Sequence, residues 1–511
     1  MVDAREFHKR TSHSPESIKE RTYRPDPSNR PRPDKRYIDV ERIRLDQIRP
    51  TQQPALAAIA QSHADVEPEG HHPEFTLTAL ATICYEANGI VQRVQHHGNE
   101  VLFRAASCTG KLYHIDLYLI CGDLDGLDAG VYHFDPSTFS FDVLRRGDYR
   151  GVIADAVNGS GGGIESAPVS VVLTSTWWRN AWKYHNRAYR HAFWDGGTVI
   201  ANLLASAHGQ GHRAQVVAGF VDNQLTRLLG VRPEMEAPIA VVPIGQGMPS
   251  PSAPAVEPID YDTAALSRES RTFSLIVDAW AQSRFEDPSN VRSWVEKADA
   301  SATIGRVKDV GEGPVSLQPV DDELASKRPL FATIKRRGSK RSFEDDGPSK
   351  AQLSTVLDRA LCGIPADWNG GGAAELTFND PYLLVTDIEG MDDGRYRYDA
   401  ASHTGEWFGT IDRATKAHLA LDQSYGGEAH VNVYLLTGLG DVVETLGNRG
   451  YRAAQLEAGI ALGRLYLASA AHRALGGTGL TFFDDLVTES LGPFATSQTP
   501  TCLYAFGKVA A

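Results

Sequence analysis

The sequence predicts a fold of mixed helices and strands made of two tandem copies of one domain. Three observations lead to this: helical and strand patterns mix in the first half, a proline-rich stretch follows them, and a motif of the first half recurs in the second. At 511 residues the chain is too long for one ordinary core, and a hydrophobic share of 42% can build two. We therefore expect an arm, two similar domains and a linker.

The internal repeat is visible when Asn186 is set against Asn448, an offset of 262 residues. The alignment pairs NRAYRHAFWDGG with NRGYRAAQLEAG without a gap, and the same offset pairs Asp222 with Asp484. GVYHFDP is matched by GRYRYDA at an offset of 264. Self-similarity at a fixed offset indicates a duplicated domain. The arginines of the shared NRxYR motif fit a helix entry, where they cap carbonyl groups or pair with acids.

The elements of the first copy follow from local patterns. EFTLTALATICYEANG (74–89) predicts a helix that ends before Gly89, and KLYHIDLYLI, VYHFDP, SVVLTST and APIAVVPIG predict strands. Before them, RPDPSNRPRP predicts an extended arm, because proline disfavours helix in the residue that precedes it. We expect the arm at 1–70, domain 1 at 71–245, a linker with a helical segment at 246–325, and domain 2 at 326–511.

Charge and composition exclude several classes of protein. A formal charge of −13 is unfavourable for binding a phosphate backbone, so nucleic acid is a poor partner. The five cysteines show no C-x-x-C spacing, which indicates neither a disulfide framework nor a structural metal. No apolar run is long enough for a signal peptide or a membrane span, so the expected location is the cytoplasm.

Two segments could carry chemistry. KRRGSKR at 335–341 places five cations around a glycine and Ser339, which suits a phosphate dianion, although a solvated basic loop has the same composition. SCTGKLY, from Ser107, joins a small-residue turn to a strand, so its backbone could approach a flat ligand closely or form a plain turn. Cys108 is not expected to be a nucleophile, because the sequence places no His/Asp pair to support it.

Several stretches together resemble the FMN-dependent SagB-type (McbC-like) dehydrogenases of the nitroreductase superfamily. They are FHKRTSHSPESI, FTLTALATICYEANGI, FRAASCTGKLYHIDLYLI, GLDAGVYHFDP and WKYHNRAYRHAFWDGG, while IKRRGSKRSFEDDGPSKAQLSTVL resembles the opening of a nitroreductase domain. The resemblance implies an α+β fold, in which two tandem nitroreductase-like α/β sandwich domains form a fused pseudo-dimer with FMN at the interface.

The resemblance also implies site residues, which come from different copies. The phosphate role falls on the basic loop of the second copy, and the role of the turn beside the isoalloxazine falls on the first. The residues implied are Arg336, Arg337, Ser339 and Arg341 for the phosphate, and Ser107, Cys108, Gly110 and Leu112 for the turn. One complete flavin site would result. The family usually has Pro-Ser-Ala-Gly where this chain has Ser-Cys-Thr-Gly at 107–110, and Gly-His-x-x-Gln-Asn where it has Gly-Thr-Val-Ile-Ala-Asn at 197–202.

Lys183 and Tyr184 occupy the position of a Lys-Tyr pair that is implicated in proton removal in azoline-oxidising members of the family. At the offset of 262 the second copy has Thr445 and Leu446 there. A nearby ammonium would favour the phenolate form of Tyr184, which could then accept a proton. The other interpretation is structural, with Tyr184 packed and Lys183 solvated.

The function implied is an FMN-dependent oxidoreductase that dehydrogenates thiazoline or oxazoline rings in a peptide or peptide-like natural product, with O2 as a candidate for reoxidising the flavin. One alternative is an NAD(P)H-dependent nitro- or ene-reductase. Another is a flavin-free partner that docks a precursor peptide or a cyclising enzyme. One fold hosts many reactions, so the resemblance does not choose the substrate.

Overall fold

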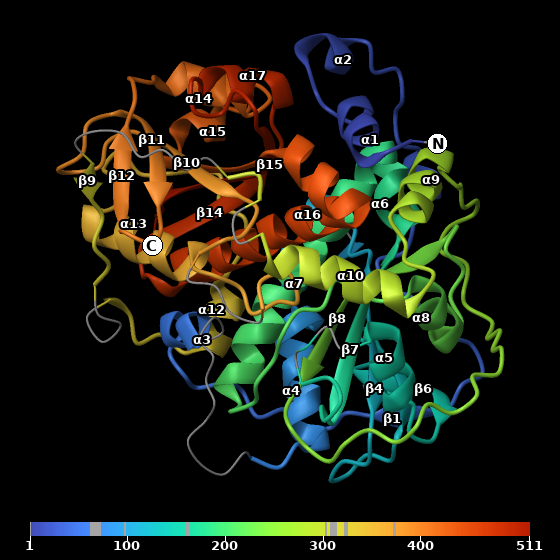
Figure 1. Ribbon diagram of the computed structural model, residues 1–511. Helices are drawn as coiled ribbons and strands as arrows, with labels where there is room; N and C mark the ends of the chain where they lie inside the picture. Colours follow the sequence, from blue (N-terminus) through green and yellow to red (C-terminus); the bar gives the residue numbers. More distant parts are fainter. Residues whose placement is uncertain are drawn as a thin grey trace.

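The computed structural model describes residues 2–61, 73–96, 99–158, 161, 163–301, 304–306, 314–320, 325–370 and 375–510. Two antiparallel sheets lie at opposite sides of the molecule, and two long central helices, α7 (Ala188–Gly209) and α16 (Leu439–Ala471), pack against each other between them (Figure 1). No helix of the described ranges combines the length and the apolar character needed to cross a bilayer.

The two sheets repeat one topology. The order β6-β5-β4-β7-β8 in the first sheet corresponds to β12-β11-β10-β13-β15 in the second, with every neighbouring pair antiparallel. The strand β1 adds to one edge of the first sheet, and β14 and β9 add to the two edges of the second. The strands are β1 (Arg42–Arg44), β4 (Ile115–Cys121), β5 (Gly130–Asp135), β6 (Ser140–Arg146), β7 (Val169–Thr176), β8 (Glu236–Ile244), β9 (Val315–Ser316), β10 (Asp380–Val385), β11 (Gly394–Asp399), β12 (Thr404–Trp407), β13 (Val431–Thr437), β14 (Leu475–Leu480) and β15 (Thr499–Lys508).

The helices of the first copy include the one expected at 74–89, which the structure places at α4 (Leu77–Asn88). The side chain of Thr76 accepts a hydrogen bond from Ala79 N, and Gly89 follows the last turn. A separate two-stranded sheet, β2 (Ile90–His96) with β3 (Asn99–Arg104), leads into the turn at 107–112. The other helices are α5 (Arg150–Val157), α6 (Trp177–Tyr184) and α8 (Asp222–Leu229).

The second copy contains the helix expected after Ser349. That residue caps α13 (Lys350–Leu361) through a reciprocal pair of hydrogen bonds with Gln352. In the expected linker, 246–260 has no helix or strand, and the helical segment after it forms α9 (Ser274–Gln282) and α10 (Pro288–Asp299). Further helices of the described residues are α12 (Leu330–Arg336), α14 (Arg413–Leu419), α15 (Ser424–Glu428) and α17 (Asp484–Ser490).

The N-terminal segment differs in part from the extended arm that proline predicts. Residues 24–33 contain no α-helix or strand and only one 3-10 turn (Pro27–Asn29), but α1 (Ala4–Arg10), α2 (Pro15–Lys19) and α3 (Ala55–Gln61) are helical. Phe7 of α1 and the apolar side of α3 are fully buried in the core. Burial of these short apolar faces against the two long helices stabilises turns that would be marginal in isolation.

The central helices cross where each copy has a glycine at the same repeat position. A Cβ on Gly197 would lie 2.3 Å from the carbonyl carbon of Gly459, and one on Gly459 would lie 2.4 Å from the carbonyl oxygen of Phe193. Only glycine permits this approach of two backbones. In the second copy the counterparts of α6 and α7 form one helix, α16, that bends at Gly447 (φ +63°).

Reciprocal ion pairs tie the copies together. Asp484 accepts hydrogen bonds from Arg187 (3.1 Å) and Arg190 (2.7 Å) of the other copy. At the repeat-related positions, Asp222 accepts from Arg452 (2.8 Å) and Arg449. All these side chains are buried. The NRxYR arginines therefore pair with acids across the interface between copies, and they also donate to backbone carbonyls, as the helix-entry interpretation expected.

Candidate active site

The predicted turn and the predicted Lys-Tyr pair meet in the first copy. Gly110 has φ +66°, and a Cβ placed on it would lie 2.7 Å from the hydroxyl oxygen of Tyr184. Tyr184 ends α6, and the Nζ of Lys183 lies 5.1 Å from the centre of its ring. A side chain at position 110 would displace the phenol, so the turn and the end of α6 form one surface.

Asp195 of α7 holds this turn in place. Its carboxylate accepts from the backbone N–H of Thr109 at 2.9 and 3.0 Å, from the Thr109 hydroxyl at 2.8 Å and from the Cys108 thiol at 3.2 Å. His114 Nε2 lies 2.8 Å from the same carboxylate, and its Nδ1 lies 2.8 Å from the Ser175 hydroxyl. Four groups converge on one carboxylate, which fixes the backbone that faces Tyr184.

The expectation that Cys108 has no His/Asp pair beside it is therefore wrong: His114 and Asp195 are both there. The long-range contact brings position 195 of α7 to the turn, which sequence spacing does not reveal. Burial, Asp195 and the hydrogen bond to it nevertheless raise the pKa of the Cys108 thiol well above its ordinary value, so a thiolate is disfavoured. Ligand atoms of the three residues lie within 4.8 Å of one another, but hydrogen bonds already account for them.

The basic loop of the second copy reaches the backbone that leads into this turn. Arg337 donates through Nε to the carbonyl of Ala105 and through Nη2 to that of Arg104, both at 3.0 Å. Its guanidinium also lies over the Tyr466 ring of α16 at 5.5 Å. Burial lowers the pKa of Arg337, and no carboxylate pairs with it among the described residues. A partly buried cation without an anionic partner has donors left for a ligand.

The other residues expected at the phosphate have different surroundings. Arg336 ends α12 and donates to the carbonyls of Ala470 (3.1 Å), Leu475 (3.0 Å) and Arg473 (2.6 Å), so it caps the end of α16. This uses three of its five N–H donors. The exposed Ser339 hydroxyl lies 3.4 Å from that of Tyr466. Arg341 is exposed, and its guanidinium lies 5.2 Å from the centre of the Tyr425 ring.

Ser107 and Leu112, two other residues expected in the turn, hold the turn against α7 and α6. The carbonyl of Ser107 accepts a hydrogen bond from Thr198 of α7 at 2.8 Å. Leu112 is buried in a small cluster with Trp178 and Trp182 of α6. The structure thus brings five of the expected residues into one region: Arg337, Cys108, Gly110, Lys183 and Tyr184. Leu112 instead packs in the apolar cluster under α6.

A small hollow lies beside the basic loop. Gly338 borders open space, since a Cβ there would meet nothing within 4 Å. The cations, the Tyr466 hydroxyl and the open backbone at Gly338 make a suitable donor set for a phosphate. The lining residues are Arg336, Arg337, Gly338, Lys340, Tyr466, Ser469, Ala470, Gly476, Gly477 and Tyr504.

The electrostatics of the Lys-Tyr pair differ from the expectation that Lys183 favours the phenolate. Burial raises the pKa of Tyr184, and Asp195 and Cys108 raise it further. Partial burial lowers the pKa of Lys183, and Arg30, Arg21 and Arg341 add to this effect. The protein therefore keeps Tyr184 protonated and makes Lys183 easier to deprotonate.

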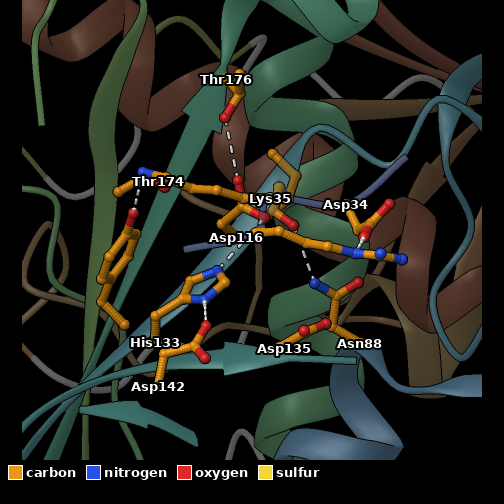
Figure 2. A network of polar contacts seen from close by, with 12 residues as sticks. Asp34, Lys35, Asn88, Asp116, His133, Asp135, Asp142, Thr174 and Thr176 are labelled. Atoms are coloured by element: carbon orange, nitrogen blue, oxygen red, sulfur yellow. Dashed lines mark hydrogen bonds and ion pairs between the residues drawn. The ribbon is translucent and has the colours of Figure 1, made fainter. Parts of the chain in front are cut away.

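A buried polar network anchors α6 to the first sheet, and Figure 2 shows its part around Asp116, His133, Asp142 and Thr176. Arg179, one turn before Lys183, donates to Asp116 at 3.0 Å, and the Thr176 hydroxyl donates to the same carboxylate at 3.0 Å. His133 lies between this carboxylate and that of Asp142, with its Nδ1 3.0 Å from Asp142. The network fixes the helix that carries the Lys-Tyr pair.

The related region of the second copy has a different arrangement, and residues 371–374 of its turn lie outside the described residues. The buried carboxylate of Asp367 accepts from the backbone N–H groups of Ala218 (2.9 Å) and Gly219 (2.7 Å). Burial raises the pKa of Asp367 to about 7. Thr445 and Leu446 stand where the first copy has Lys183 and Tyr184.

Sequence reasoning missed Asp195 and Tyr466. A signal for Asp195 existed in the repeat: Glu457 is its counterpart at the offset of 262. Glu457 accepts from the backbone N–H groups of Thr377 (2.5 Å) and Phe378 (2.9 Å), which precede β10. A buried acid at the same repeat position of both central helices indicates a shared anchoring role.

Comparisons with known proteins agree with this architecture. Residues 100–246 match the model of the nitroreductase family. A proposed nitroreductase of Methanocaldococcus jannaschii is 24% identical over 171 residues, which are 34% of this chain and 81% of that protein. The crystal structure of a proposed nitroreductase from Anabaena variabilis has a TM-score of 0.76 at 22% identity, with 100% of both chains covered.

Two further structures overlap less. The Escherichia coli microcin synthetase McbBCD complex with truncated pro-MccB17 bound has a TM-score of 0.30 at 17% identity, over 48% of this chain and 88% of that one. A proposed nitroreductase from Exiguobacterium sibiricum in complex with FMN has a TM-score of 0.25 at 10% identity, over 39% and 93%. The full-length match and the repeated sheets confirm the predicted α+β fold, in which two nitroreductase-like domains form a fused pseudo-dimer.

Proposed function

We propose that the protein is an FMN-dependent oxidoreductase that dehydrogenates thiazoline or oxazoline rings in a peptide-derived substrate. The observation that carries the proposal is the meeting of two predicted half-sites from different copies. Arg337 of the second copy is hydrogen-bonded to the backbone that leads into the turn of the first, and that turn packs against Tyr184. The match of residues 100–246 to the nitroreductase family supports the oxidoreductase class.

FMN fits the residues present. Its phosphate would lie by Arg337, Ser339 and the hollow beside Gly338, where cations lack a carboxylate partner among the described residues. Its ring would lie on the side of the turn at Cys108 and Gly110. When bound, FMN supplies the electron acceptor of a two-electron oxidation. The second copy has Thr445 and Leu446 in place of the Lys-Tyr pair, which supports one complete flavin site per chain.

The protein's own groups would handle the proton. Lys183 in its neutral form accepts the proton from the ring carbon next to the nitrogen, because partial burial and neighbouring arginines lower its pKa. Tyr184, which stays protonated, donates a hydrogen bond to the substrate and fixes its position. Asp195 keeps the turn rigid, and Arg179 keeps α6 on the sheet.

The test begins with the purified protein. Bound FMN is identified by mass spectrometry after denaturation, and the flavin absorbance is then followed under anaerobic conditions with a thiazoline-containing model peptide. Bleaching of the flavin together with loss of two hydrogen atoms from the peptide is the expected result. Reduction by NADPH but not by the peptide would favour a nitro- or ene-reductase instead. Absence of any flavin would leave a peptide-docking role.

A further inference from the structure

Two chain segments that are distant in sequence wrap the end of α6 beside Lys183. Arg21 donates to the carbonyl of Lys183 at 2.7 Å, and the Tyr23 hydroxyl donates to that of Trp182 at 2.6 Å. The indole N–H of Trp182 donates in return to the carbonyl of Asp26 at 3.0 Å. Hydrogen bonds from side chains to backbone carbonyls thus fix residues 21–30 against the end of α6.

The second segment precedes α9. The Trp178 indole donates to the Ser267 hydroxyl at 2.8 Å, and Phe273 packs on His185 with ring centres 5.4 Å apart. His185 also contacts Tyr23, at 3.7 Å between ring centres. Residues 21–30 and 266–273 therefore form a common rim around Lys183.

This rim is cationic in a chain whose formal charge is −13. The two segments hold five arginines, at 21, 24, 30, 268 and 271, and two acids, Asp26 and Glu269. Asp26 pairs with Arg268 at 3.5 Å. Arg30 lies 6.0 Å from the centre of the Trp182 ring, and it and Arg271 are exposed.

Electrostatic effects agree with this placement. Arg30 and Arg21 lower the pKa of Lys183, and both Arg21 and Arg271 lower that of His185 after the larger effect of burial. Among the described residues, no carboxylate pairs with Arg21, Arg30 or Arg271. A concentration of like charge destabilises the protein unless an anion offsets it.

We propose that this rim receives a substrate with negative charge, an acidic group of which is bound by Arg21, Arg30 and Arg271 next to Lys183. The inference rests on the proposed function and specifies its substrate class. The FMN phosphate is a different anion: it is assigned to the hollow at Gly338, which the second copy lines. The rim belongs to the N-terminal segment, α6 and the segment before α9.

The test uses electron acceptors of known charge in place of the unidentified substrate. The flavoprotein is photoreduced, and its reoxidation by the dianion anthraquinone-2,6-disulfonate is compared with that by neutral menadione in stopped-flow experiments. Arg21→Gln, Arg30→Gln and Arg271→Gln are combined, because glutamine keeps a donor for the Lys183 carbonyl. The ratio of the two rates is expected to fall about tenfold or more, and its dependence on salt to weaken.

The matched control combines Arg44→Gln, Arg227→Gln and Arg232→Gln, which are exposed elsewhere and remove the same charge. It is expected to keep the ratio of the parent protein. An unchanged ratio in the rim variant, or an equal fall in the control, would overturn the proposal. A protein without flavin would refute the proposed function instead. In that case binding of trisulfonated pyranine, measured by fluorescence anisotropy, tests the rim: equal affinity in parent and rim variant rejects it.

Discussion

Gly197 and Gly459 occupy the same position in the two copies and face each other where α7 crosses α16. A Cβ on Gly197 would lie 2.3 Å from the Gly459 carbonyl carbon. The contact joins a residue to its own repeat partner, which is the relationship expected at a pseudo-twofold axis. The ion pairs follow the same symmetry, because Asp222 of the first copy pairs with arginines of the second and Asp484 of the second copy pairs with arginines of the first.

Gly459→Ala is expected to lower the free energy of unfolding by about 1–3 kcal/mol, because the added methyl group forces two backbones apart. Chemical denaturation measures the change. Gly440→Ala is the control: it lies in the same helix with nothing within 4 Å of its Cβ, so it is expected to be neutral or slightly stabilising. Equal effects at the two positions would contradict the close crossing.

Asp484→Asn and Asp222→Asn are expected to destabilise the protein by similar amounts, about 3–5 kcal/mol each, because each leaves two buried arginines without their charge partner. Denaturant titration again provides the measurement. The neighbouring Asp485 is exposed, and Asp485→Asn is expected to change stability by no more than about 0.5 kcal/mol. A large loss of stability in only one of the two variants would contradict the prediction that the Asp222 and Asp484 ion pairs stabilise the protein equally.

Arg337→Ala is expected to weaken FMN binding about tenfold or more, since a charge-assisted contact is worth about 1.5–3 kcal/mol. Fluorescence of free FMN during titration gives the dissociation constant, and Arg336→Ala with Arg337→Ala should strip the flavin. Lys335→Ala removes a cation that is exposed and lies over Phe331, and it is expected to leave binding nearly unchanged. Full flavin occupancy in the double variant would refute the phosphate assignment.

Lys183→Ala and Tyr184→Phe are expected to slow substrate oxidation about 10²- to 10⁴-fold with flavin still bound. Since neutral Lys183 is the base, the rate should rise with pH through a pKa below 10.5, and this rise should disappear in Lys183→Arg. Single-turnover kinetics checks both points. Thr445→Ala changes the related position of the second copy and should leave turnover almost unchanged. Near-normal oxidation by both Lys183→Ala and Tyr184→Phe would mean that the pair has a structural role only.

His133 gives the stability a pH dependence. Burial lowers its pKa, but Asp116 and Asp142 raise it more, so the folded value lies above the ordinary 6.5. Stabilisation by the protonated ring is therefore fully present below about pH 6.5 and is lost as the pH rises through the folded pKa. Denaturation over this range should show the decline in the parent protein and not in His133→Gln. The same slope in both would assign it to another group.

Patterns with a local cause could be predicted from the sequence. The duplication, α4 and the cap of α13 follow from residues a few positions apart, or from one alignment. Adjacent arginines were less predictable: Arg336 is the last residue of α12, whereas Arg337 has an extended backbone, so their side chains diverge. The contact between Asp195 and Thr109 spans 86 residues and depends on how α7 packs, which no local pattern encodes.

The reciprocal pairs also have an evolutionary consequence. In a dimer of identical subunits every substitution appears twice, so the loss of a Lys-Tyr pair or a basic loop would remove both sites together. Fusion ends that constraint, because the linker guarantees that each half meets its unlike partner at a high effective concentration. Thr445 and Leu446 could then drift in the second half while Lys183 and Tyr184 remained in the first. In the fused chain the two halves can therefore differ in sequence and in role, whereas the two subunits of a homodimer cannot.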